Sequence, residues 1–171
     1  PLGPDQDQTT FGGRVGISTR ERGLIEGRAQ IGMFRLNPAD PLQNNRSGIS
    51  ADISLTVRPQ QRTAITISAF SGDVATFRLG AVAREDTNLI LGVQQEIRHN
   101  FYGSLGLALR RSKFLGSGDV EKTIGPRAEV EWLANKTLSL AAYANFNHRT
   151  SNVAIDEFDR FRAGVTVRLR Y

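Results

Sequence analysis

The chain has 171 residues, of which 39% are hydrophobic and 23% are charged, and its formal net charge is +5. This composition is too apolar for a disordered chain and too polar for a protein built of membrane-spanning helices. Cysteine is absent, which excludes a disulfide scaffold, a thiolate metal site and a cysteine nucleophile.

The basic residues are spread along the whole chain. There are nineteen arginines and three lysines, and no stretch concentrates them as a nucleic-acid interface would, so we expect no nucleic acid partner. Residues 1–10 (PLGPDQDQTT) are polar and lack the basic start and apolar centre of a secretory signal. We expect them to be a flexible leader in front of one domain over residues 11–171.

From residue 11 onward, apolar and polar residues alternate in one segment after another. In the last segment every odd position from Phe161 to Tyr171 is apolar, and every even position from Arg160 to Arg170 is Arg, Gly or Thr. In a strand this period of two places all apolar side chains on one face, whereas a helix would scatter them. The alternation predicts an all-β chain with nine main strands, near residues 11–20, 24–36, 48–58, 62–72, 84–98, 101–113, 123–134, 137–149 and 159–171.

The lengths of these segments and of their connections favour an antiparallel up-and-down transmembrane β-barrel. The expected strands exceed the roughly 5 to 6 residues usual in soluble sheets and match the roughly 9 to 11 tilted residues that cross a bilayer. Short turns alternate with long connections over 37–48, 112–122 and 150–158, as in bacterial barrels with short periplasmic turns and long external loops. We expect acidic residues to gather in the external connections: Asp40, Asp73, Glu85, Asp86, Asp119, Glu121, Asp156 and Glu157.

Nine strands do not suit a complete bacterial barrel, which has an even number. Either residues 76–83, within an expected connection over 72–84, form a tenth strand, or the chain is the C-terminal part of a larger barrel. We favour the second interpretation.

The end of the chain resembles the assembly signal of bacterial outer-membrane barrels, with Val165, Val167, Leu169 and a final aromatic Tyr171. Short turns at residues 57–59, 96–100 and 133–140, and the segment 149–152, add to this pattern. Over roughly residues 24–171 the chain resembles the C-terminal part of the family named putative β-barrel porin, from Gram-negative bacteria.

The resemblance implies a location in the outer membrane of a Gram-negative cell and a role beside exopolysaccharide export. It implies outer-membrane lipid and lipopolysaccharide, the barrel-assembly machinery and polysaccharide export proteins as partners. We expect no enzyme activity and no cofactor. The resemblance indicates a place and an architecture rather than a reaction.

The polar face of the predicted strands is the best indication of function. Rings of arginine in a pore favour anions, and facing acids can pair with part of them. The residues expected to line a lumen are Arg14, Arg28, Asp52, Arg58, Glu96, Arg98, Arg110, Arg127, Glu129, Glu131, Arg160, Arg162, Arg168 and Arg170. Aromatic residues near strand ends are expected to form interfacial girdles: Phe101, Tyr102, Trp132, Tyr143, Phe146, Phe161 and Tyr171.

Four functions stay open at this point. The first is a porin-like channel for polar or anionic solutes, or an exopolysaccharide export component. The others are a closed structural or accessory barrel, a soluble β protein that binds a polyanion, and an outer-leaflet lipid hydrolase using His148, Ser151 and Glu157. The hydrolase is the weakest, because Ser151 lies three positions after His148 and a regular strand then points them to opposite faces. We expect no metal site, since neither 119–121 nor 156–159 has the spacing of a known calcium loop.

Overall fold

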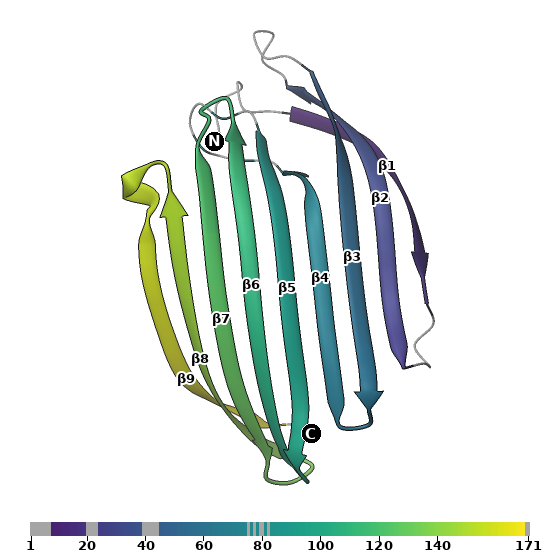
Figure 1. Cartoon of the computed structure of the whole chain (residues 1–171), viewed down its shortest axis with the longest axis vertical. Helices are drawn as coiled ribbons and strands as arrows, with labels where there is room; N and C mark the ends of the chain where they lie inside the picture. Colours follow the sequence, from purple (N-terminus) through teal and green to yellow (C-terminus); the bar gives the residue numbers. More distant parts are fainter. Residues whose placement is uncertain are drawn as a thin grey trace.

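The computed structural model describes residues 8–19, 24–38, 45–74, 76, 78, 81 and 83–169. They form one antiparallel sheet in which each strand pairs with the next along the chain (Figure 1). A short 3-10 helix, η2 (Ala154–Asp156), lies before the last strand. The strands are β1 (Gln8–Ser18), β2 (Ile25–Pro38), β3 (Arg46–Gln60), β4 (Thr63–Val74), β5 (Ala83–Arg98), β6 (Phe101–Leu115), β7 (Val120–Leu133), β8 (Leu138–Ser151) and β9 (Phe158–Leu169).

The register gives the sheet two chemically different faces. One face presents residues such as Asn88, Arg110 and Thr123, which are paired across β5, β6 and β7. The other presents Leu89, Leu109 and Ile124 on the same three strands. Since paired residues point to the same side of an antiparallel sheet, we call these the inner and the outer face.

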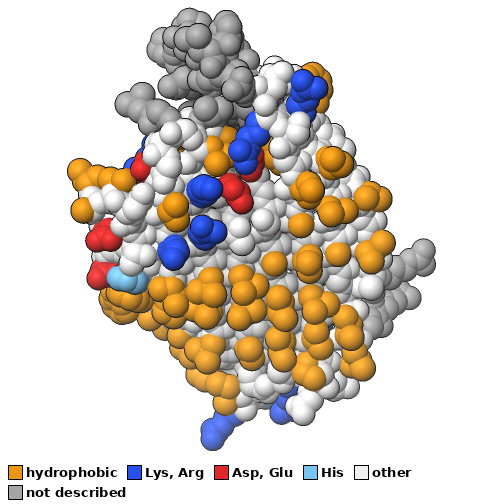
Figure 2. Space-filling model, turned by 45° about the horizontal axis from the view of Figure 1, so that its top comes forward, with side chains coloured by type: hydrophobic (Ala, Val, Ile, Leu, Met, Phe, Trp, Pro, Cys, Tyr) orange, Lys and Arg blue, Asp and Glu red, His pale blue; other side chains and the backbone are white. Residues whose placement is uncertain are grey.

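Most large apolar side chains are exposed on the outer face, where Figure 2 shows a broad hydrophobic band. Val165, Ile17 and Met33 are 75%, 78% and 71% exposed. Among the described residues, the only buried hydrophobic ones are Ala83, Phe114 and Ala141. The apolar residues therefore do not form a closed core within this sheet. They form an unpartnered surface, which a soluble monomer rarely leaves exposed.

The strands reach further than the alternation indicates. The connection expected over 112–122 is only residues 116–119, because β6 continues to Leu115 and β7 begins at Val120. Asp73, Glu85, Asp86 and Glu121, expected in loops, lie in strands. The hydrogen-bonded ladder continues past the apolar band, where both faces are polar and a period of two no longer marks a strand. Asp119, Asp156 and Glu157 do lie in connections, and Asp40 is outside the described residues.

The two ends of the sheet differ only in part as expected, because the connection 116–119 at one end is as short as the connection 134–137 at the other. One end carries the connections 39–45, 75–82, 116–119 and 152–157, and the other carries 19–24, 61–62, 99–100 and 134–137 (Figure 1). We refer to them as the loop end and the turn end. At the turn end Asn100 adopts φ 65, a conformation that Asn tolerates in tight hairpins.

The edges of the sheet are open among the described residues, because β1 and β9 do not pair with each other. The described residues of the segment 76–83 give no tenth strand: Thr76, Arg78 and Ala81 are in no regular element, and Ala83 begins β5. β1 begins at Gln8, so residues 8–10 of the expected leader are strand, and residues 1–7 lie outside the described part. No helix in the described ranges is long and apolar enough to cross a membrane.

The aromatic residues divide between the faces, which corrects part of the expected girdle. Phe101 pairs with Trp132 on the outer face near the turn end, and Phe146 pairs with Phe161 within the apolar band. Tyr102 pairs with Glu131 on the inner face, and Tyr143 pairs there with Gly164. Tyr102 and Tyr143 therefore cannot belong to a lipid-facing girdle. Tyr171 lies outside the described residues.

Candidate functional site

The inner face collects most of the residues expected to line a lumen. The strand register places on it Arg14, Arg28, Asp52, Glu96, Arg110, Arg127, Glu129, Glu131, Arg160, Arg162 and Arg168. Arg58 reaches Glu26 of this face at 2.5 Å. Arg98 lies at a register shift between β5 and β6, and Arg170 is outside the described residues. That this face lines a lumen stays a prediction.

Ion pairs hold much of this face together toward the turn end. Arg168 on β9 reaches over β8 to Glu131 on β7, at 3.0 Å, and also approaches Glu129 at 3.8 Å. Arg127 forms an ion pair with Glu129, and Arg28 lies 3.5 Å from Asp52. The neighbouring strand β8 contains no Asp or Glu. Arg168 finds its partners two strands away.

A second group of charges centres on Asp86, whose side chain is 5% exposed. Its carboxylate accepts hydrogen bonds from Arg84 at 2.8 Å, Arg110 at 2.7 Å and the hydroxyl of Ser112 at 2.7 Å. Buried carboxylates are stable only when their acceptor sites are filled in this way. Asp86 therefore joins the loop end of β5 to β6 through charge-assisted bonds.

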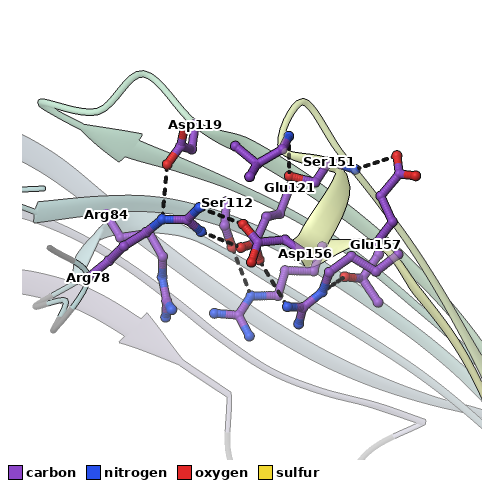
Figure 3. A network of polar contacts seen from close by, with 12 residues as sticks. Arg78, Arg84, Ser112, Asp119, Glu121, Ser151, Asp156 and Glu157 are labelled. Carbon is purple, nitrogen blue, oxygen red and sulfur yellow. Dashed lines mark hydrogen bonds and ion pairs between the residues drawn. The ribbon is translucent and has the colours of Figure 1, made fainter. Parts of the chain in front are cut away.

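The third group crosses the inner face at the loop end (Figure 3). Arg78, in the connection between β4 and β5, contacts Asp119 at 2.9 Å, Glu121 at 3.0 Å and Asp156 at 2.5 Å. Its guanidinium also lies 4.6 Å from the ring centre of Phe114, within the range of a cation–π contact. One side chain therefore joins the β4–β5 connection to β7 and to two other connections.

The contacts of Arg78 with acidic residues stabilise the charged form of its guanidinium. The hydrogen bond to Asp156 raises the pKa of its guanidinium, desolvation opposes this, and the charges of Asp119, Asp156 and Glu121 raise it further. Arg149 of β8 adds a second cation to Glu121, at 3.2 Å. The cluster is thus a compact, mixed-charge layer at one end of the inner face.

Between these groups the inner face is hollowed. A cavity of about 590 Å³ is lined by amide, hydroxyl and charged side chains, by small residues, and by Ile90, Leu107 and Pro126. Glycine makes the room: a Cβ on Gly125 would lie 2.6 Å from Asn147 Oδ1, and one on Gly164 would lie 2.8 Å from Tyr143 Oη. Gly16, Gly32, Gly92 and Gly106 also lie on this face. Side chains that donate and accept hydrogen bonds can bind water or a polar solute there.

Arg14, Arg160 and Arg162 differ from the other inner arginines. None of them forms an ion pair with a described residue, although Arg160 lies 5.1 Å from the ring centre of Phe158. Their guanidinium groups are thus available to solvent or to an anion.

The proposed hydrolase residues do not come together. His148 pairs with Ile124 and Asp159 on the outer face, and its Nδ1 lies 2.6 Å from Asp159 Oδ1. Ser151 pairs with Glu121 on the inner face, and its hydroxyl accepts the backbone N–H of Val153. Glu157 accepts the backbone N–H of Ser151 rather than a histidine proton. His148 cannot act as the base for Ser151 from the opposite side of the sheet.

The sequence pattern placed Asp119 and Asp156 in connections but did not indicate that they contact Arg78. Arg84 and Asp86 share the alternating phase of the inner residues further along β5, which would have placed them correctly. Arg78, Asp119 and Asp156 lie in connections, so no periodicity reports them. No group of three or more His, Asp or Glu in the described ranges could hold a metal ion.

Comparison with known proteins agrees with this architecture. Among solved structures, the fold is similar to OmpTdeltaL8, a loop L8 deletion mutant of OmpT, an outer membrane protein of Vibrio cholerae. The TM-score is 0.58 at 9% sequence identity, and the match covers 91% of this chain and 53% of that chain. This chain thus spans about half of that neighbour's length, and the likeness concerns the fold alone.

A search of curated proteins gives no match. The profile of the family described as putative beta-barrel porin 2 matches residues 2–171. Since this match covers nearly the whole chain, and the strands are those of an outer-membrane barrel wall, the chain belongs to the putative beta-barrel porin 2 family.

Proposed function

We propose that the chain forms part of the wall of a water-filled channel in the outer membrane of a Gram-negative cell, through which polar solutes pass with a preference for anions. The observation that carries the proposal is the division of the sheet. Apolar side chains are exposed on the outer face, while the inner face is polar and rich in arginine. Transport through such a wall is passive and needs neither a bond-making step nor a cofactor.

The preference for anions comes from the arginines without partners. Most inner arginines form an ion pair with a carboxylate. They therefore contribute little to the net electrostatic field of the inner face. Arg14, Arg160 and Arg162 have none among the described residues, and arginine rings in a pore attract anions. The cavity beside Asn145 and Asn147 supports passage of hydroxyl-rich solutes, in agreement with the exopolysaccharide role that the family resemblance implies.

The channel needs more wall than this sheet. In a bilayer every unpaired backbone group costs several kcal/mol, so the open edges of β1 and β9 must find partners. A barrel of eight strands is filled by its own side chains, whereas about 16 strands leave an aqueous channel. We propose that further strands complete the barrel on both edges, which fits the coverage of 53% of the similar solved chain.

Single-channel recording in planar bilayers tests this function. The complete protein should conduct, and a salt gradient should give a reversal potential of the sign for anion selectivity. The double variant Arg160→Gln/Arg162→Gln should shift that potential toward cations. Lys136→Gln, in the turn between β7 and β8, is the matched control and should leave it unchanged. A protein that inserts but does not conduct would instead be a closed accessory barrel.

The closed barrel is the second candidate, because the Arg78 contacts draw the β4–β5 connection across the inner face.

A third outcome also refutes the channel. If the protein stays monomeric and soluble without detergent, its apolar face is covered by something other than lipid. Binding of a polyanion then becomes the leading function.

A further inference from the structure

A row of polar residues crosses the outer face at the loop end, directly next to the apolar band. Thr87, Arg111, Lys122 and Thr150 are paired in this order across β5, β6, β7 and β8. All four are exposed. The next row toward the turn end begins with Leu89, Leu109 and Ile124. The row therefore marks the boundary where the lipid-facing surface changes from apolar to polar.

Arg111 and Lys122 at the centre of this row have no acidic partner in the described part of the chain. Neither forms an ion pair or a side-chain hydrogen bond with a described residue. The neighbouring Arg110 faces inward and binds Asp86 at 2.7 Å. Like charges directly opposite each other destabilise an antiparallel pair, so an anion between Arg111 and Lys122 would relieve a repulsion that the sheet leaves uncompensated.

The acidic groups near the row are already engaged or lie beyond it. Asp159 contacts His148, one row nearer the turn end. Glu85 lies opposite Lys113 in the strand register, one row nearer the loop end. Lys113 and Lys122 are the only lysines in the strands of the described ranges, and both lie on the outer face at this height.

The surface at this point is hollowed and amphipathic. A cavity of about 340 Å³ is lined by Thr87, Arg111, Lys122 and Thr150 on one side and by Leu89, Leu109 and Ile124 on the other. A soluble anion would use only the polar side. A phosphorylated lipid would use both, with its phosphate at the basic pair and its acyl chains along the aliphatic residues.

We propose that Arg111 and Lys122 bind a phosphate of an outer-leaflet glycolipid, with Thr87 and Thr150 as hydroxyl donors beside them. The inference rests on the proposed outer-membrane placement, since long connections mark the external end of such barrels and the row lies at that end. Lipopolysaccharide supplies the required chemistry: phosphates at the height of the headgroups, joined to saturated acyl chains below.

Binding of defined lipids to the complete protein in detergent micelles tests the proposal. The probes are bisphosphorylated lipid A and the same acylated disaccharide without phosphates. We expect the phosphorylated lipid to bind at least about tenfold more tightly, because two charge-assisted contacts depend on it. Inorganic phosphate at millimolar concentration should not compete, because it lacks the acyl contacts.

The double variant Arg111→Gln/Lys122→Gln should remove the difference between the two lipids, and Lys136→Gln should preserve it. Equal binding of both lipids by the unaltered protein would overturn the proposal, and so would an undiminished difference in the double variant. If that variant does not assemble, the comparison of the two lipids on the unaltered protein decides. If the unaltered protein conducts normally but binds both lipids equally, the lipid site alone is refuted. If it binds the phosphorylated lipid preferentially but does not conduct, the channel alone is refuted.

Discussion

Replacing Asp86 by asparagine tests whether the charges on the inner face stabilise the sheet. Asparagine keeps the size of the side chain and an oxygen that accepts the Ser112 hydroxyl. Its amide can turn either way, with the NH₂ toward the arginines, which are donors only, or toward the Ser112 hydroxyl, which can accept. In both orientations the bonds from Arg84 at 2.8 Å and Arg110 at 2.7 Å lose their ionised acceptor.

The structure sets the size of the effect. A hydrogen bond to a charged group contributes about 1.5 to 3 kcal/mol. The side chains of Arg84 and Arg110 are 27% and 39% exposed, so water replaces part of each lost bond. We expect Asp86→Asn to lower the free energy of unfolding by about 2 kcal/mol.

Urea unfolding of the protein in micelles, followed by heat-modifiable gel migration, measures this loss. Glu96→Gln is the matched control, because Glu96 lies 3.9 Å from an Arg62 that is 63% exposed, and an exposed pair contributes about 0 to 1 kcal/mol. A double-mutant cycle of Asp86→Asn with Arg110→Gln should show coupling. If Asp86→Asn costs no more than Glu96→Gln, the role assigned to the Asp86 contacts is refuted.

Two further predictions concern the inner face. Arg78→Gln should release the β4–β5 connection and speed its cleavage by added chymotrypsin, whereas Arg62→Gln at the turn end should not; equal cleavage rates would contradict the role of Arg78. Because the pKa of Arg78 is raised, its charge and its contribution are complete below the ordinary arginine pKa and are lost only above it, so mildly alkaline buffer should not speed cleavage of the unaltered protein. Gly164→Val should lower the free energy of unfolding by about 1 to 3 kcal/mol, because a Cβ there lies 2.8 Å from Tyr143 Oη. Adding Tyr143→Ala should recover part of that loss in the same urea assay, and no recovery would refute the clash.

The sequence predicted the strands well because their alternation reflects a simple physical condition. One face of the sheet meets apolar surroundings. Every second residue of a strand must therefore be apolar where the strand crosses the apolar band. The expected strand over 101–113 became β6 (Phe101–Leu115), and the expected strand over 84–98 became β5 (Ala83–Arg98). Errors gather at the loop end, where the ladder continues beyond the apolar band and the rule no longer applies.

The loop-end network could not be predicted from the sequence. Arg78 and Asp156 are 78 residues apart along the chain, and their contact depends on the register of every strand between them. To predict the face of the sheet on which a side chain lies, the register near the strand ends must also be known. Tyr143 was expected at an interface, yet it lies against Gly164 on the inner face.

In the proposed placement the apolar face meets lipid and the polar face meets water, and the single tryptophan of the chain tests this. Trp132 lies on the outer face, 50% exposed, near the turn end. In vesicles of brominated phosphatidylcholine its fluorescence should be strongly quenched, while iodide in the aqueous phase should have little effect.

The variant Trp132→Phe/Tyr102→Trp carries the tryptophan to the inner face at nearly the same height, since Phe101, next to Tyr102, is the partner of Trp132. There we expect the reverse, with quenching by iodide and little quenching by the brominated lipid. Quenching of Trp132 by iodide but not by brominated lipid would show that the apolar face does not lie in a membrane, and would contradict the proposed placement.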